Sequence, residues 1–343
     1  MPVNLMDRES TVITDVTDGR RTMQAIVQFR YGSPADLEVR EIAVPELDDD
    51  GVLVRVRAAS VNAYDWHIMR GKPYLVRAVE GLRAPKQNVL GVDMAGIVEA
   101  VGRNVTQFRP GDDVFGEHER AFAEYVCAPE RALALKPTNL TFEQAAAIPM
   151  AGFTALQALR DAGQIQAGQA VLIHGAAGGV GTFAVQLAKA FGAEVTGVCS
   201  TGNVDMVRSI GADYVIDYTR EDVMTRRQRY DLILDVAGNR SLSDYRRLLV
   251  PKGTLVLVGA PQGQWIGPLV RPLTALVWSR FVSQRMRTLL AKRSNADMVM
   301  LKELIEAGKV TPVIDRTYPL GETADAIRYV EVGHAQGKVV ITV

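Results

Sequence analysis

Glycines are concentrated between residues 175 and 181, in the order Gly-Ala-Ala-Gly-Gly-Val-Gly. The apolar run Ala170–His174 before them predicts a buried strand, and the periodicity of residues 179–191 predicts a helix. Glycines at such a junction allow a tight turn and close approach of a ligand, and the free N–H groups at the helix start attract phosphate. The spacing is one residue longer than G-x-G-x-x-G, and a tight turn without a ligand is the alternative. We expect the pyrophosphate of a dinucleotide at Gly175, Ala177, Gly178, Gly179, Val180 and Gly181.

The end of the next predicted strand, residues 194–198, should decide which dinucleotide binds. Sites for NAD carry a carboxylate about 20 residues after the loop, where it binds the ribose hydroxyls. That place falls at Ser200, and no carboxylate occurs before Asp205. Hydroxyl and amide groups can donate to a 2′-phosphate, so we expect NADPH to be preferred over NADH. The donors would come from Ser200, Thr201 and Asn203, with Arg208, Tyr218 and Arg220 either contributing or lying on the solvated surface.

The first half of the chain has the pattern of a mostly β domain. Between residues 23 and 137, short apolar runs are separated by glycine, proline and acidic turns. The expected strands are residues 25–29, 52–58, 94–101 and 123–128.

From residue 141 onward, helical and strand patterns alternate. The expected helices are residues 143–149, 153–160, 179–191, 205–210, 241–249 and 296–307. The expected strands are residues 170–174, 194–198, 214–216, 231–236, 254–258, 310–314 and 338–343. This alternation predicts an α/β fold with a doubly wound parallel sheet, the Rossmann arrangement.

Composition narrows the class of protein further. The 343 residues are enough for two domains, and 39 basic residues balance 39 acidic ones, which argues against nucleic acid as a partner. Two distant cysteines, Cys127 and Cys199, argue against a disulfide framework and favour a reducing, cytoplasmic setting. No apolar run is long enough to span a membrane, and residues 1–22 have the composition of a flexible tail or an overextended gene start.

Several segments together carry a family likeness. They are residues 60–65 (Ser-Val-Asn-Ala-Tyr-Asp), 91–96 (Gly-Val-Asp-Met-Ala-Gly), 147–156, the glycine loop, and 337–340 (Gly-Lys-Val-Val). From residue 23 to 343 the chain resembles the zinc-independent quinone oxidoreductase and enone reductase branch of the medium-chain dehydrogenase/reductase superfamily. The resemblance implies a GroES-like catalytic domain of residues 23–148 and 286–343, and a Rossmann domain of residues 149–285. It also implies a homodimer formed through an edge strand at residues 254–258.

The resemblance also bears on metal binding. Zinc-dependent relatives have cysteine, histidine and cysteine ligands where this chain has Asn62, Val92 and Ala151. Their structural zinc needs four closely spaced cysteines, and this chain has two distant ones. The remaining histidines, His67, His118, His174 and His334, show no paired spacing on one helix, so we expect no metal site.

The catalytic residues implied by the resemblance are Asn62, Tyr64, Asp65 and Tyr74. Asn62 would donate its amide to the substrate, Tyr64 would stack or donate its hydroxyl, and Asp65 would hold the loop. Tyr74 is the nearest match to the proton-donating tyrosine of related enoyl reductases, displaced by one residue. Trp66 and His67 would wall the pocket or pack in the core, and Thr154 and Gly259 would lie near the nicotinamide.

We therefore expect an NADPH-dependent enzyme that transfers hydride to a small molecule, a quinone or an α,β-unsaturated carbonyl. The alternatives are a metal-independent alcohol or carbonyl dehydrogenase, and a non-catalytic dinucleotide-binding protein. Residues 261–293 mix apolar side chains with arginines and lysines. That segment would form a lid and a dimer contact, or alternatively touch an anionic membrane surface.

Overall fold

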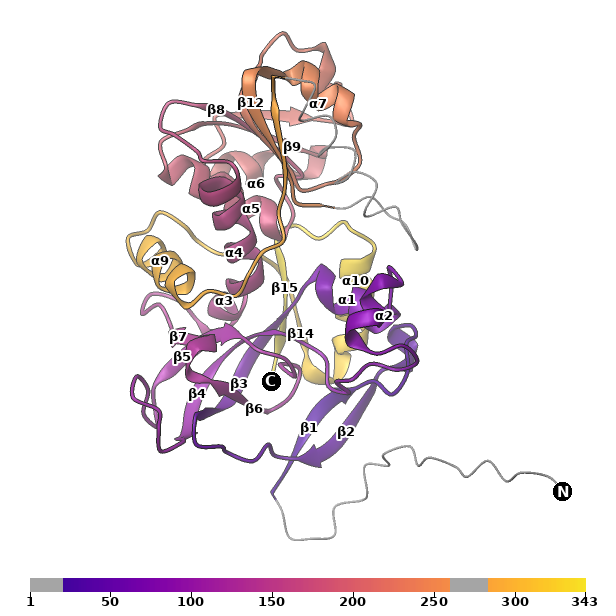
Figure 1. The fold of residues 1–343 in the computed structure, drawn as a ribbon, viewed down its shortest axis with the longest axis vertical. Coiled ribbons are helices and arrows are strands. Elements are labelled where there is room, and N and C mark those ends of the chain that lie inside the picture. The colour runs from indigo at the N-terminus through magenta and orange to yellow at the C-terminus, as the bar shows by residue number, and fades with distance from the viewer. Residues whose placement is uncertain (1–20, 260–282) are drawn as a thin grey trace, which may run out of the picture.

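The structure is a computed structural model, and it describes residues 21–259 and 283–343. These residues form two lobes, one above the other in Figure 1. The first 20 residues of the expected tail and most of the segment 261–293 lie outside the described residues. No helix in the described part of the chain is long and apolar enough to cross a membrane.

The lower lobe is mostly β, as the sequence predicts, and its strands pair antiparallel except for β14 and β15, which are parallel. Its main sheet has the order β14-β15-β3-β4-β5-β7, with β6 added to β3, and β1 and β2 form a separate hairpin. The early strands are β1 (Thr22–Val27), β2 (Glu38–Ala43), β3 (Gly51–Val61), β4 (Asp93–Val101), β5 (Asp113–Glu117), β6 (Tyr125–Pro129) and β7 (Leu133–Leu135). The late strands β14 (Ile314–Pro319) and β15 (Lys338–Thr342) return to this sheet, so the lobe is discontinuous in sequence. Figure 1 shows β15, in yellow, among the violet strands.

Short helices close the lower lobe. They are α1 (Ala63–Arg70), α2 (Leu75–Glu80), α3 (Phe142–Ala146) and α10 (Thr323–Glu331). Gly71 ends α1 with a left-handed backbone, φ +58°, a conformation that glycine adopts without strain. Arg70 joins α1 to α10 through two hydrogen bonds of 2.7 Å to the carboxylate of Glu331.

The upper lobe is a six-stranded parallel sheet. Its strands are β8 (Ala170–His174), β9 (Glu194–Cys199), β10 (Tyr214–Asp217), β11 (Tyr230–Asp235), β12 (Leu249–Leu257) and β13 (Arg285–Thr288). The spatial order is β10-β9-β8-β11-β12-β13, which is the Rossmann order 3-2-1-4-5-6. The lobe's helices are α4 (Pro149–Gln157), α5 (Gly179–Ala190), α6 (Val204–Ser209) and α7 (Leu242–Leu248). Helix α9 (Asn295–Glu306) lies where the lobes meet and packs on both α4 and β7 (Figure 1). The expected fold class is confirmed, and ligands of such sheets bind where the strand order reverses, between β8 and β11.

Two expected strands differ from the structure. Residues 254–258 do not form an edge, because β12 pairs on its far side with β13, Thr254 opposite Arg285 and Leu257 opposite Thr288. The short, basic β13 is therefore the edge of this sheet among the described strands, and it crosses the boundary expected between residues 285 and 286. Its sequence Arg-Met-Arg-Thr lacks an apolar run, which hides it from a periodicity search, and charged residues protect an edge from unwanted pairing.

The second difference concerns residues 310–314, which precede β14. Val310 is buried in the core, but the strand begins at Ile314. Pro312 has no N–H to donate to a neighbouring strand. The apolar residues before Ile314 therefore contribute to packing, and the sequence alone does not separate that role from strand pairing.

Candidate functional site

The glycine loop lies at the carboxyl end of β8 and leads into α5, at the reversal of strand order. Gly175 has φ +92°, in the region that favours glycine. A Cβ on Gly181 would lie 2.0 Å from the carbonyl oxygen of Gly175, so the loop closes only without a side chain there. A Cβ on Gly178 would meet nothing closer than 3.8 Å. Packing thus explains Gly181, and the open space at Gly178, the N-cap of α5, leaves room for a phosphate.

Polar side chains gather where β9 ends. Thr201 donates its hydroxyl to Asp217 at 2.6 Å, and Asn203 donates its amide to the Ser200 hydroxyl at 3.0 Å. The amide oxygen of Asn203 is buried without a partner among the described residues. A buried acceptor left open is what a ribose hydroxyl would satisfy, so Asn203 fits a bound dinucleotide.

Asp217 is a carboxylate in this region that counting along the chain missed. Because β10 runs parallel to β9, with Asp217 opposite Cys199, the carboxylate lies beside the Ser200 turn. The hydrogen bond from the Thr201 hydroxyl lowers the pKa of Asp217, so its carboxylate is ionised. The guanidinium of Arg220 lies 3.4 Å from it. The signal in the sequence is an acidic residue at the carboxyl end of the neighbouring parallel strand.

The other expected donors to a 2′-phosphate lie on the surface. Tyr218 is exposed, and its backbone N–H binds the carbonyl of Cys199 at 3.0 Å. Arg208 lies 3.6 Å from Asp205 on α6, both with largely exposed side chains. The structure therefore brings Ser200, Thr201 and Asn203 together, with Arg220 as the nearest cation to Asp217.

The Asn62 side chain, expected to donate to a substrate, is held inside the protein instead. Its amide nitrogen donates to Asp93 at 2.9 Å and to the carbonyl of Ser60 at 3.3 Å. Its amide oxygen accepts from the ammonium of Lys338 at 2.5 Å. Both ends of the amide have protein partners, so donation from Asn62 to a substrate would require one of these hydrogen bonds to break.

Asp65 holds this loop. Its carboxylate accepts the backbone N–H of Asn62 at 2.7 Å and caps the start of α1. Burial raises the pKa of Asp65 to about 8. The group therefore keeps its proton at neutral pH, and it acts on the reaction only through the loop.

This raised pKa gives a stability test. The unfolded chain loses the proton of Asp65 near the usual pKa of about 4, whereas the folded chain keeps it to about 8. The contribution of Asp65 to stability should therefore be greatest at low pH and fall as pH rises between those values, by about 1.4 kcal/mol per pH unit. Asp65→Asn should remove that slope when urea midpoints are measured from about pH 5 to pH 8. Equal slopes in both proteins would mean that Asp65 is ionised in the fold. Asp161→Asn is the control on an exposed carboxylate.

Asp93 and Lys338 are functional candidates to which sequence reasoning gave no role. Asp93 is fully buried and also accepts the Ser60 hydroxyl at 3.2 Å and the backbone N–H of Met150 at 3.1 Å. Lys338 is the first residue of β15, and its ammonium lies 3.6 Å from the Asp93 carboxylate. Burial raises the pKa of Asp93 and lowers that of Lys338, and each charge opposes the shift in the other. The sequence does contain a signal for both residues. Each is a charged residue in a largely apolar segment, Asp93 in the motif of residues 91–96 and Lys338 in the motif of residues 337–340.

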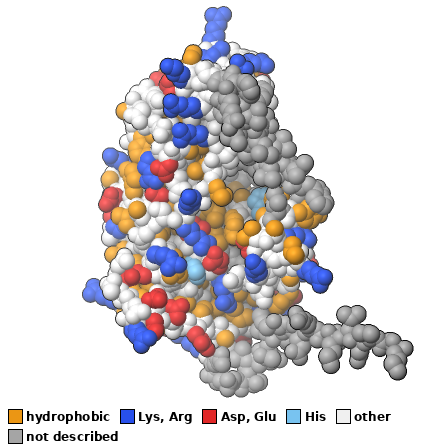
Figure 2. All heavy atoms as spheres, viewed as in Figure 1, with side chains coloured by type: hydrophobic (Ala, Val, Ile, Leu, Met, Phe, Trp, Pro, Cys, Tyr) orange, Lys and Arg blue, Asp and Glu red, His pale blue; other side chains and the backbone are white. Residues whose placement is uncertain are grey.

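Tyr64 lines a cavity of about 30 Å³, large enough for one water molecule. Its hydroxyl lies 3.4 Å from the Glu80 carboxylate. The other residues that line the cavity are Asp65, Ile68, Gln87, Val89, Leu90, Gly91, Val92 and Glu119. Burial raises the pKa of Tyr64, so its hydroxyl stays protonated and can donate a hydrogen bond. On the face seen in Figure 2, hydrophobic side chains gather between the two lobes.

Tyr74 does not line the cavity beside Tyr64. It is the N-cap of α2, and the guanidinium of Arg77 lies 5.0 Å from its ring centre. Trp66 and His67 pack against each other with ring centres 3.6 Å apart, and Trp66 packs against the core of the lower lobe. His67 is further held by a 2.8 Å contact with the carbonyl of Lys72. The geometry thus favours Tyr64 over Tyr74 as a hydrogen-bond donor, and core packing for Trp66.

Thr154 and Gly259 have defined local roles. The hydroxyl of Thr154 donates to the carbonyl of Met150 at 2.7 Å, one turn earlier in α4. Gly259 follows β12, and a Cβ there would lie 2.1 Å from the carbonyl oxygen of Val236. Gly259 therefore allows a close approach of two backbones at the carboxyl end of the sheet, on the same edge as the glycine loop.

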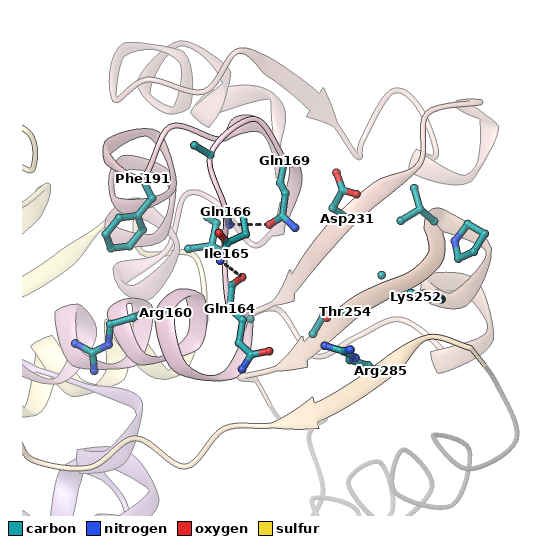
Figure 3. Close-up of a pocket in the computed structure, with 15 residues that line it drawn as sticks. Arg160, Gln164, Ile165, Gln166, Gln169, Phe191, Asp231, Lys252, Thr254 and Arg285 are labelled. Carbon is teal, nitrogen blue, oxygen red and sulfur yellow. Dashed lines mark hydrogen bonds between the residues drawn. The ribbon is translucent and has the colours of Figure 1, made fainter.

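A cavity of about 850 Å³ lies at the opposite edge of the same sheet (Figure 3). Figure 3 shows Gln169, Asp231 and Arg285 at or near the beginnings of β8, β11 and β13, and Thr254 within β12. None of the expected site residues lines it. Because the glycine loop is at the carboxyl ends of these strands, this cavity is not part of the candidate site.

The positions of zinc ligands in zinc-dependent relatives do not fit a metal here. Val92 and Ala151 are buried apolar side chains, and the Asn62 amide is engaged by Asp93 and Lys338. Across the described residues, no three His, Cys, Asp or Glu side chains are grouped as metal ligands. His174 is buried and lies 2.5 Å from the Tyr245 hydroxyl, and Cys127 and Cys199 are free thiols.

Comparison with known proteins finds relatives that match both lobes of the chain. Residues 48–138 match the alcohol dehydrogenase GroES-like domain, and residues 210–341 match a family described as zinc-binding dehydrogenase. The 2-methylene-furan-3-one reductase of Solanum lycopersicum is 36% identical over 93% of this chain and 79% of its own length. The chloroplastic NADPH-dependent alkenal/one oxidoreductase of Arabidopsis thaliana is 35% identical over 94% and 80%. The solved quinone oxidoreductase of Coxiella burnetii is 30% identical, with a TM-score of 0.82 over 94% of this chain and all of that one.

The two lobes, the glycine loop and these matches define a medium-chain dehydrogenase/reductase, with a GroES-like lower lobe and a Rossmann upper lobe. Within that superfamily, the chain belongs to the quinone oxidoreductase and alkenal/one reductase branch, whose members are NAD(P)H-dependent oxidoreductases.

Proposed function

We propose that this protein uses NADPH to reduce a quinone or an α,β-unsaturated carbonyl, without zinc. One observation carries the proposal: the open glycine loop of the upper lobe meets the Asn62 loop of the lower lobe. Gly337 donates its N–H to Ala177 at 2.8 Å, and its neighbour Lys338 binds Asn62. A dinucleotide on the loop would therefore have its reactive end beside Tyr64 and the apolar surface between the lobes.

NADPH supplies a hydride when it is bound. A conjugated acceptor spreads the resulting charge onto its oxygen, so the protein needs only to orient the acceptor, exclude water and offer a hydrogen bond. The protonated hydroxyl of Tyr64 supplies that hydrogen bond. The apolar residues Val92 and Ala151, at positions of zinc ligands, provide no Lewis acid for alcohol oxidation.

The preference for NADPH rests on Ser200, Thr201 and Asn203, with Arg220 as an added cation. Asp217 opposes it, but its carboxylate is already bound by the hydroxyls of Thr201 and Thr219 and approached by Arg220. The hydroxyl of Ser200 accepts only the Asn203 amide among the described residues, and its own proton is available for a phosphate oxygen.

Ser200→Asp should shift the preference from NADPH toward NADH. The new carboxylate would accept the ribose hydroxyls of NADH and repel the 2′-phosphate, and each 1.4 kcal/mol changes the ratio of affinities about tenfold. Binding of both cofactors should be measured by fluorescence titration, with Ser200→Asn as the uncharged control of equal size. An unchanged ratio would place the discriminating groups elsewhere, with Arg220 the next residue to replace.

Turnover tests the proposal as a whole. NADPH oxidation should be followed by absorbance with a benzoquinone, phenanthrenequinone and a short alkenal, in the presence of EDTA, with NADH in parallel. We expect turnover that EDTA does not reduce. Activity only on saturated alcohols or ketones would favour the metal-independent dehydrogenase. Tight NADPH binding with no turnover of any acceptor would favour the non-catalytic role.

We also propose that the protein is a cytoplasmic homodimer. In the upper sheet, β13 rather than residues 254–258 is the edge, among the described strands, that could pair with a second copy. Light scattering on the purified protein should give twice the 37.4 kDa mass of the chain, and a monomer at all concentrations would contradict it.

A further inference from the structure

Lys338 and Asp93 form an ion pair inside the protein, in the region where the two lobes meet. Their charged atoms are 3.6 Å apart, and their side chains are 4% and 0% exposed. Removing two charges from water is costly, and well-packed apolar residues of similar size often give equal or greater stability. Stability alone therefore does not account for the pair. Its role is better judged from the segments of the fold that it joins.

On one side, Lys338 is joined to the glycine loop. The preceding residue, Gly337, pairs with Gly178 in a parallel bridge and donates its N–H to Ala177. A Cβ on Gly179 would lie 3.0 Å from Cδ of Lys338, so the aliphatic part of Lys338 lies against the first turn of α5. The residues that would hold the pyrophosphate thus rest on Gly337 and Lys338.

On the other side, Asp93 binds two segments near the expected reaction site, the end of β3 with the Asn62 loop and the start of α4. It accepts from the Ser60 hydroxyl at the end of β3, from the Asn62 amide, and from the N–H of Met150. Met150 lies in the first turn of α4, the helix that carries Thr154. A single carboxylate therefore fixes the Asn62 loop relative to α4, and Lys338 connects both to the glycine loop.

Other charges face the pair from neighbouring elements. Glu117 on β5 faces Lys338, and Arg293 binds Glu117 at 2.9 Å. Asp65 on α1 also faces Lys338, but it is protonated at neutral pH and becomes a charge only above about pH 8. Replacing Lys338 alone would leave Asp93 and Glu117 as buried like charges, with Arg293 bound to Glu117 as the remaining cation among the described residues. The informative variant therefore neutralises Lys338 and Asp93 together.

We propose that Lys338 and Asp93 are positioning residues for the reduction, which set the glycine loop at a fixed distance from the Asn62 loop and Tyr64. This inference rests on the proposed function. Reacting atoms must approach to about 3–3.5 Å, and a displacement of about 1 Å can reduce the rate about 100-fold. Loss of the pair should thus slow the reduction with little loss of affinity, because the pyrophosphate site itself is kept.

The test is the double variant Lys338→Met/Asp93→Asn, whose side chains are uncharged and similar in size. We expect kcat to fall about 100-fold and the deuterium isotope effect with NADPH labelled at the transferred position to rise. The Kd of NADPH, measured by fluorescence titration, should stay close to that of the wild type. The matched control is Lys189→Met/Asp213→Asn, which removes a 2.8 Å ion pair at the carboxyl end of α5, away from the glycine loop, and should leave kcat unchanged.

A folded double variant with wild-type kcat and isotope effect would overturn the proposal. If the variant does not fold, hydrogen exchange on the wild type decides: NADPH should slow exchange in residues 62–70, and no change there would also overturn it. The exchange measurement needs no turnover. Absence of NADPH oxidation by the wild type with every acceptor would therefore count against the proposed function, whereas the exchange result would still judge the Lys338–Asp93 connection.

Discussion

Gly178→Asp should abolish NADPH binding while leaving the fold intact. A Cβ at Gly178 meets nothing within 3.8 Å, and aspartate is a favoured residue at the N-cap of a helix, the place Gly178 has in α5. The carboxylate would lie where the pyrophosphate is expected. Repulsion between two charges about 4 Å apart near a protein surface is about 4 kcal/mol, so the Kd should rise by more than about 100-fold.

Gly178→Asn is the matched control, because asparagine has the same size and the same capping ability without the charge. Titration of NADPH against cofactor fluorescence should separate the two variants, and urea unfolding should show that both are folded. Equal affinities for wild type and Gly178→Asp would move the dinucleotide site away from this loop.

Gly181→Ala should destabilise the upper lobe, although it adds only one methyl group. The new Cβ would lie 2.0 Å from the carbonyl oxygen of Gly175 and 2.8 Å from the carbonyl carbon of Ala176. Both neighbours are backbone atoms, so the loop or α5 must move as a unit. We expect a loss of about 3 kcal/mol in the free energy of unfolding, together with loss of NADPH binding by the displaced loop.

Gly321→Ala is the control, since a Cβ there meets nothing within 4 Å. It should change stability by less than about 0.5 kcal/mol. Urea unfolding followed by circular dichroism measures both variants. A Gly181→Ala protein as stable as the control would show that the turn between β8 and α5 adapts to a side chain, and that close packing does not require this glycine.

Much of the fold could be predicted because its elements have strong local patterns. A stretch of about a dozen residues is enough to predict each of four features: the apolar strands β8, β9 and β11, and the glycine loop. β13 was missed because its register comes from pairing with β12 and not from its own sequence. Residues 310–313 were misread for the opposite reason, since burial of Val310 imitates a strand pattern.

The site was only partly predictable, because much of it depends on contacts between distant segments. Ser200 and Thr201 follow one strand and could be located by counting, but Asp217 reaches them only through the parallel pairing of β9 and β10. Asn62 was identified, but the partners of its amide were not, because Asp93 and Lys338 lie 31 and 276 residues away along the chain. Residue type and spacing along the chain do not contain that information.

The position of β15 in the lower sheet also has a consequence for folding during synthesis on the ribosome. β15 lies between β14 and β3, so the main sheet of the lower lobe, which begins with β3 at residue 51, is incomplete until residues 338–342 have been synthesised. By then every described strand of the upper lobe has already been made. The nucleotide lobe can therefore fold first, as domains generally fold as units during synthesis. Until β15 has been synthesised, residues 58–61 of the long apolar strand β3 have no pairing partner on that edge. Such an exposed edge can pair with other chains, so a chaperone that binds this segment would prevent aggregation.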